Sequence, residues 1–163
     1  MKNSSILMVV KGLGLGGAER HVVDMAIALK NLDYDISVCF ILPDQNELVS
    51  ELEAEGVSVT CIGSRFWIVS SIINFINIVI KKRPQLVHAH LPVPAILARC
   101  CKPFFRYSLV FTEHNVIDRL HPITKIAHKL THFLDDLSIS CSEAVAASLP
   151  WHSVVVNNGI DIP

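Results

Sequence analysis

The segment from Gly12 to Leu29, GLGLGGAERHVVDMAIAL, constrains the fold of this chain more than any other part of its sequence. An apolar run at residues 6–10 precedes it and is typical of a buried strand, and the apolar residues of 18–29 recur at helical spacing. A strand, a glycine-rich turn and a helix in this order aim free backbone N–H groups and the positive end of a helix dipole at one place. The segment therefore predicts a binding site for a phosphate group.

Short apolar segments alternate with helical segments along the whole chain. We expect strands at 6–10, 36–42, 58–61, 86–90, 108–112, 137–140 and 154–156, and helices at 18–29, 46–55, 66–82, 94–101, 122–133 and 143–149. Such alternation is typical of a mostly parallel sheet with helices on both faces. The predicted fold class is therefore α/β, a Rossmann-like three-layer domain.

Charge and cysteine content narrow the class of protein. The formal net charge of −1 gives no indication of a surface for nucleic acid. Five cysteines, none of them in C-x-x-C spacing, predict reduced thiols and no metal site. The N-terminus carries only Lys2 before polar residues and lacks the pattern of a signal peptide, so we expect a cytoplasmic protein.

The longest apolar stretch runs from residue 66 to residue 80, which is shorter than the roughly 20 residues that a membrane span needs. Ser70, Ser71, Asn74 and Asn77 form a narrow polar stripe along it. Two interpretations stay open. The stretch is either a helix packed on the sheet or a helix lying in the membrane interface, with the basic residues 81–83 at its end.

Polar residues follow five of the expected strands at the point where each strand ends. Ligands of open α/β sheets bind outside the carboxyl ends of the strands, so these residues should converge on one edge. This convergence indicates a site more strongly than any single segment does. The segments are the glycine loop, His88-Ala89-His90, Thr112-Glu113-His114-Asn115, Ser140-Cys141-Ser142-Glu143 and residues 157–161.

The histidines of this edge are candidates for acid–base chemistry. His114 follows an apolar strand and lies between Glu113 and Asn115, where a neutral imidazole could bond a sugar hydroxyl or accept a proton. We expect the side chains of His88 and His90 to point to opposite faces of their strand. In that arrangement His90 would face the cleft, and His88 would be a buried structural residue.

Two further motifs have weaker functional interpretations. Gly12, Gly14 and Gly17 match the dinucleotide fingerprint G-x-G-x-x-G, but the acidic partner would be near Asp44, beyond the usual interval of ~20 residues. Phosphate binding without a nicotinamide is preferred, and a nicotinamide-dependent domain is an alternative. Ser142 is expected to cap the helix that follows it, since no serine here has the G-x-S-x-G context of a hydrolase.

Five blocks of sequence, taken together, resemble the N-terminal domain of a family-4 retaining glycosyltransferase of the GT-B architecture. The blocks are GGAERHVVDMAIAL at 16–29, LVHAH at 86–90, VFTEHN at 110–115, SISCSEAVAASL at 138–149 and VVNNGID at 155–161. They follow the order and spacing of the family over nearly the whole chain. One departure is Asn157, which stands where the family usually has proline.

The resemblance implies an enzyme of two Rossmann-like domains with the active site in the cleft between them. Residues 1–156 would form the acceptor-side domain, and residues 157–163 would begin the crossover to a missing C-terminal domain that binds the nucleotide sugar. Gly16 and Gly17 match the family's loop near the donor diphosphate. His114 matches the histidine that faces the transferred sugar, and His90 matches a cleft-lining position. The further substrate-binding candidates are Glu113 and Asn115.

The implied function is transfer of a sugar, with retention, from a nucleotide diphosphate sugar to a glycan or lipid-linked acceptor, without a cofactor or a bound metal. The fragment alone is expected to be inactive, and a non-catalytic ligand-binding module is an alternative. Acceptors of this family are often membrane-borne. We therefore expect Phe66, Trp67 and Ile68 to touch the inner face of the membrane, with complete burial against the sheet as the alternative.

Overall fold

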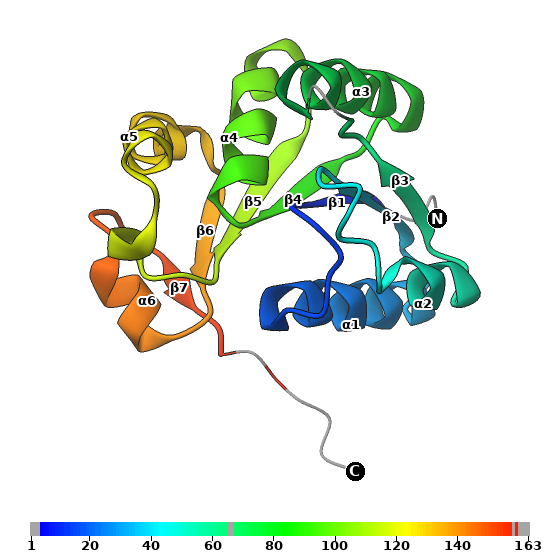
Figure 1. Ribbon diagram of the computed structural model, residues 1–163, viewed down its shortest axis with the longest axis horizontal. Helices are drawn as coiled ribbons and strands as arrows, with labels where there is room; N and C mark the ends of the chain where they lie inside the picture. The colour runs from blue at the N-terminus through cyan, green and yellow to red at the C-terminus, as the bar shows by residue number, and fades with distance from the viewer. Residues whose placement is uncertain (1–3, 65–66, 158, 160–163) are drawn as a thin grey trace.

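A seven-stranded sheet forms the centre of the structure, a computed structural model that describes residues 4–64, 67–157 and 159 (Figure 1). The strand order is β3-β2-β1-β4-β5-β6-β7, and every neighbouring pair is parallel. All carboxyl ends of the strands therefore lie along one edge. The strands are β1 Ser5–Val10, β2 Asp35–Phe40, β3 Ser58–Cys61, β4 Leu86–His90, β5 Ser108–Glu113, β6 Leu137–Ser140 and β7 Val154–Val155.

Helices cover both faces of this sheet. The α-helices are α1 Gly17–Asn31, α2 Val49–Ala54, α3 Trp67–Lys82, α4 Pro92–Cys101, α5 Pro122–Thr131 and α6 Glu143–Ser148. Helices α1 and α2 pack on one face, α3, α4 and α5 lie on the other, and α6 lies beside β6 and β7 (Figure 1). Short 3-10 helices are η1 Lys102–Phe104, η2 Ile117–Arg119 and η3 His132–Leu134.

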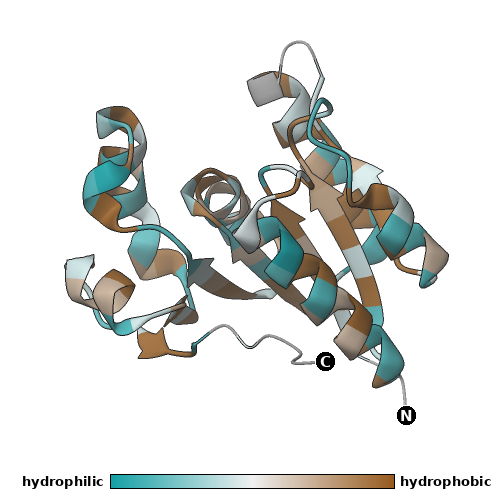
Figure 2. Ribbon diagram, turned by 60° about the horizontal axis from the view of Figure 1, so that its bottom comes forward, coloured by the Kyte–Doolittle hydropathy of each residue, from teal (hydrophilic) through white to brown (hydrophobic). Residues whose placement is uncertain are grey.

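Strand β1 explains why the chain forms three layers. Leu7 and Val9 belong to the core cluster under α3 and α4, and Met8 belongs to the cluster under α1 and α2. A strand that is buried on both faces has a continuous apolar sequence, as the central strands in Figure 2 show. The predicted α/β fold class is confirmed.

The boundaries of several elements differ from the prediction for local reasons. Helix α4 begins at Pro92 rather than at Pro94, because proline fits the first turn of a helix. Strand β2 ends at Phe40 rather than at residue 42, because the amides of Ile41 and Leu42 both donate to the carbonyl of Lys11. That contact ties the end of β2 to the loop that follows β1.

Helix α3 packs on the sheet through its inner side, where Phe75 and Val79 are buried. This confirms the helix-on-sheet interpretation for these residues, although Ile73 on the outer side is 54% exposed. Phe66 and the side chains of Trp67 and Ile68 lie outside the described residues, so the predicted contact there stays a prediction. None of the described helices is long and apolar enough to cross a bilayer.

Candidate functional site

The glycine loop lies at the point where the strand order reverses, since β1 has β2 on one side and β4 on the other. Its first half is structural. Leu13 is fully buried, its amide donates to the carbonyl of Gln45 at 2.8 Å, and its carbonyl accepts from Leu48 at 2.9 Å. A Cβ on Gly12 would collide with the side chain of Gln45 at 2.3 Å. Gly12 therefore serves the turn rather than a ligand.

The second half of the loop is open and reaches the start of α1. Gly16 is the N-cap residue, with an extended backbone and no side-chain hydrogen bond to the helix. Apart from its chain neighbours and the backbone of α1, a Cβ on Gly17 would have no heavy atom within 4 Å. The Glu19 carboxylate lies against Gly16, so the space in front of the first amides of α1 that an anionic group can enter is on the Gly17 side. Leu15, at the tip of the loop, is 81% exposed, and no pattern in the sequence predicts this exposure.

Four histidines lie together on the α1 side of the sheet, next to this loop. The rings of His88 and His90 lie 4.1 Å apart between centroids, and those of His90 and His114 lie 5.5 Å apart. His21 of α1 completes the group, with its ring centroid 5.7 Å from that of His114. His21 was not among the site residues predicted from the sequence, although its position one turn after the glycine loop could have indicated it.

The expectation that His88 and His90 point to opposite faces is wrong. Side chains alternate along a strand with a period of two, so residues two apart share a face. His88 binds Thr112 Oγ1 through Nε2 at 2.8 Å and is buried, as expected for a structural histidine. His90 is also completely buried, and its Nδ1 lies 3.2 Å from Nε2 of His114. His90 thus lies behind His114 rather than at the surface of the edge.

The buried histidines are neutral near pH 7. Burial lowers the pKa of His114 to about 4, and the neighbouring His21 adds to this shift. Burial likewise lowers the pKa of His88 to about 4 and holds the pKa of His90 well below its usual value. A neutral ring has one N–H donor and one lone pair, so His114 can bond a hydroxyl group in either sense.

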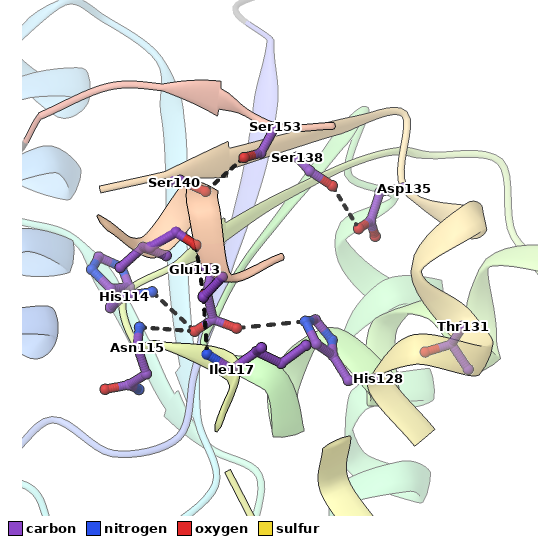
Figure 3. Close-up of polar contacts among 12 residues, drawn as sticks. Glu113, His114, Asn115, Ile117, His128, Thr131, Asp135, Ser138, Ser140 and Ser153 are labelled. Atoms are coloured by element: carbon purple, nitrogen blue, oxygen red, sulfur yellow. Dashed lines mark hydrogen bonds and ion pairs between the residues drawn. The ribbon is translucent and has the colours of Figure 1, made fainter. Parts of the chain in front are cut away.

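Glu113 and Asn115 occupy different environments from that of His114. The Glu113 side chain is completely buried on the α5 side, where its Oε1 accepts the backbone N–H groups of His114 at 3.0 Å and Asn115 at 3.1 Å (Figure 3). Its Oε2 lies 3.5 Å from Nε2 of His128. Asn115 is exposed just beyond the strand end. Of the predicted site residues, His90 and His114 are therefore in contact with each other. Glu113 lies beneath the loop that carries His114 and Asn115.

Two other predicted features are visible at this edge. Ser142 caps α6, since its Oγ accepts the amide of Val145 at 3.3 Å, so that prediction is confirmed. Within the part of the chain that the structure describes, no group of three or more His, Cys, Asp or Glu residues is arranged to hold a metal ion.

Comparison with known proteins gives the family of this chain. The profile of Glycosyltransferase Family 4 matches residues 15–162. Among solved structures, Alr3699/HepE of Anabaena with UDP-glucose has a TM-score of 0.80 at 17% identity, covering 96% of this chain and 44% of that chain. A glycosyltransferase of Rickettsia africae has a TM-score of 0.75 at 20% identity, covering 99% of this chain and 44% of that chain.

A third similar structure is the lipopolysaccharide outer core galactosyltransferase WaaB, with a TM-score of 0.72 at 11% identity over 88% of this chain and 41% of that chain. At these identities the likeness shows a shared fold. The chain spans about 44% of the length of the first of these relatives. No curated protein sequence matches the chain significantly.

Proposed function

The chain belongs to Glycosyltransferase Family 4, and from this premise we propose that it is the acceptor-side half of a retaining glycosyltransferase. Such an enzyme would transfer a sugar from a nucleotide diphosphate sugar to a glycan or lipid-linked acceptor. The observation that supports this most is the juxtaposition, at the switch point of the sheet, of a helix N-terminus that is open at Gly17 and a neutral histidine. The first suits a departing diphosphate, and the second suits a sugar hydroxyl.

The reaction breaks the bond between the anomeric carbon and the diphosphate oxygen, and the electron pair leaves on that oxygen. The acceptor oxygen bonds the same carbon on the same face, and its proton passes to the departing diphosphate oxygen. In the proposed site, the amides at Gly16 and Gly17 stabilise the negative charge that grows on the diphosphate. His114 orients the sugar and the acceptor hydroxyl, and His90 holds the ring of His114 from behind. The second half of the enzyme would hold the nucleotide.

The two alternative functions make different predictions. A nicotinamide-binding domain would use the glycine loop as a dinucleotide fingerprint, yet Leu13 in the middle of that loop is buried and bonded to the Gln45–Leu48 segment. A non-catalytic module would bind a nucleotide sugar without turnover. Titration with UDP-sugar, GDP-sugar and NAD tests the dinucleotide alternative, since only that alternative predicts saturable binding of NAD, and a turnover assay tests the non-catalytic one.

The decisive experiment is an assay of the complete enzyme with the anomeric configuration of the product determined by NMR. HepE shares the fold and has been solved with UDP-glucose, so a uridine diphosphate sugar is the first donor to test. We expect transfer with retention by the complete enzyme and no transfer by residues 1–163 alone. Inversion, or turnover by residues 1–163, would contradict the proposal.

We further propose that the outer side of α5 and η3 makes peripheral contact with the inner face of an anionic membrane. Four apolar side chains along α5 and η3 are exposed, by 72% at Ile123, 59% at Ile126, 68% at Leu130 and 71% at Phe133. Lys129 of the same helix is exposed, and so is Arg119 of η2 in the segment before it. An apolar stripe flanked by basic residues is typical of a helix that lies in the membrane interface. Such contact would bring a lipid-linked acceptor to the site.

A further inference from the structure

Arg99 has a completely buried side chain and lies at the centre of a polar cluster between α4 and α5. Its Nε and Nη2 atoms donate to the two carboxylate oxygens of Asp135, at 2.7 and 2.6 Å. Its Nη1 lies 2.6 Å from Nδ1 of His128, and its guanidinium carbon lies 4.8 Å from the ring centre of Phe111. A buried cation is tolerated only when it is paired in this way, so these contacts fix the guanidinium in one orientation.

The orientation of Arg99 determines the tautomer of His128. A guanidinium group only donates hydrogen bonds, so Nδ1 of His128 must accept and carries no proton. The proton of the neutral ring is then on Nε2, which lies 3.5 Å from Oε2 of Glu113. Neither of these two buried atoms has a hydrogen-bond partner among the described residues, so the ring and the carboxylate face each other in a long polar contact. The Nε2–H group of His128 therefore faces a carboxylate oxygen that must accept.

Glu113 carries this constraint to the loop that follows β5. While Oε2 faces His128, Oε1 accepts the backbone N–H groups of His114 and Asn115 (Figure 3). These two amides belong to the first residues after the strand, so the carboxylate fixes the direction in which the chain leaves the sheet. With no exposed surface of its own, the Glu113 side chain acts through these amides.

We propose that Arg99, His128 and Glu113 are positioning residues for His114. Arg99 orients His128, His128 orients the Glu113 carboxylate, and that carboxylate holds the backbone that carries His114. For Glu113, this positioning role replaces the direct contact with substrate that the sequence predicted. It rests on the proposed role of His114 in sugar transfer, but the loop order that it predicts does not depend on any reaction.

The test compares His128→Asn with the matched control Thr131→Val. Asparagine places an oxygen near the position of Nδ1, so Arg99 keeps an acceptor while the donor to Glu113 is lost. Thr131 lies one turn later on α5 and accepts from Arg99 Nη1 at 3.3 Å, so the control removes a bond of the same arginine outside the proposed chain. The first measurement is backbone amide hydrogen exchange in residues 1–163, with the amides of β1 as the reference for global stability.

We expect His128→Asn to speed exchange at His114 and Asn115 by roughly tenfold relative to β1, because it removes the buried donor that faces the carboxylate holding these two amides. Thr131→Val should leave the ratio unchanged. In the complete enzyme, His128→Asn should lower kcat by roughly tenfold with a donor KM within about twofold of the original. Unchanged exchange overturns the chain of contacts, whatever the enzyme does. Faster exchange with an unchanged kcat overturns the positioning role.

A second variant covers the case in which His128→Asn fails to fold. Glu113→Gln keeps the volume and an oxygen for the two amides, but its NH₂ group then meets the Nε2–H of His128 donor to donor. We expect the same gain in exchange at His114 and Asn115.

The ¹⁵N spectrum of the His128 ring in the unsubstituted chain is an independent check. An Nε2–H tautomer supports the proposal, and an Nδ1–H tautomer or an imidazolium overturns it. If the complete enzyme without any substitution transfers no sugar, the proposed function is refuted, but these measurements of exchange and tautomer stay valid.

Discussion

Nδ1 of His90 lies 3.2 Å from Nε2 of His114, and the two rings are stacked with 27° between their planes. Burial holds the pKa of both rings low, so one ring donates a proton to this bond and the other accepts it. His90 has no exposed surface and so provides a fixed partner. The half-buried His114 is thus oriented through its ring by His90 and through its backbone by Glu113, which leaves Nδ1 as its second bonding atom.

Replacing His114 by alanine in the complete enzyme should lower kcat far more than it raises the donor KM. A polar group that acts mainly in the transition state contributes on the order of 10²–10⁴ to the rate. Steady-state kinetics with varied donor concentration measures both parameters. His152→Ala, at an exposed histidine far along the chain, is the control and should be near normal. A kcat within a factor of two for His114→Ala would assign His114 a structural role.

Acid should destabilise the chain through its buried histidines. The folded-state pKa of His88 and of His114 is lowered to about 4, whereas an unfolded histidine titrates near ~6.5. Between these values the unfolded chain binds more protons, so stability rises with pH in this window. The contribution of the neutral rings is complete above about pH 6.5 and is lost as pH falls toward 4.

Thermal unfolding between pH 4.5 and 7.5 measures this dependence. Tm should decrease as pH is lowered over the acid half of the range. His114→Asn should make this dependence of Tm on pH shallower, because one of the titrating groups is gone. The same replacement at the exposed His152 should leave the slope unaltered. An identical slope in all three proteins would show that the histidine cluster does not govern acid stability.

Much of the fold could be predicted because β1 is buried on both faces, and its residues 6–10 are an unbroken apolar run. The glycine loop followed from the same local pattern. The structural importance of Arg99 and His128 could not be predicted, because their partners lie 36 and 15 residues away in sequence and meet them only through packing. The error at His88 and His90 had a simpler cause, since the strand period itself places both on one face.

Gly17→Val should impair donor use while the chain stays folded. Apart from its chain neighbours and the backbone of α1, a Cβ at this position meets nothing within 4 Å, so the larger side chain has room in the protein itself. It would occupy the space in front of the first amides of α1 and keep the diphosphate away from them. We expect a donor KM raised by on the order of tenfold or more, together with a lower kcat, because each charge-assisted bond to a phosphate contributes roughly 1.5–3 kcal/mol.

Gly14→Ala is the matched control for Gly17→Val. It lies in the same loop, and its Cβ would make an ordinary contact of 3.5 Å with the side chain of Glu47. Circular dichroism should show both variants folded. Unchanged donor kinetics in Gly17→Val would mean that the whole glycine loop, like Gly12, is only a turn.

The double variant Ile126→Ser, Leu130→Ser should weaken binding to anionic membranes. Both side chains are exposed by more than half, so their replacement leaves the core intact. Complete burial of one such side chain contributes about 1.5–3 kcal/mol, so even partial insertion of two predicts roughly tenfold weaker partitioning.

Co-sedimentation with phosphatidylglycerol liposomes measures this, and added salt should weaken the binding of the unsubstituted chain because its basic residues contribute. Leu32→Ser, which removes a leucine that is 69% exposed at the end of α1 on the opposite face, should bind normally. Trp67→Ser tests the contact predicted at the start of α3 in the same assay. Equal loss of binding in Leu32→Ser, or no binding by any of the proteins, would contradict a membrane contact through α5.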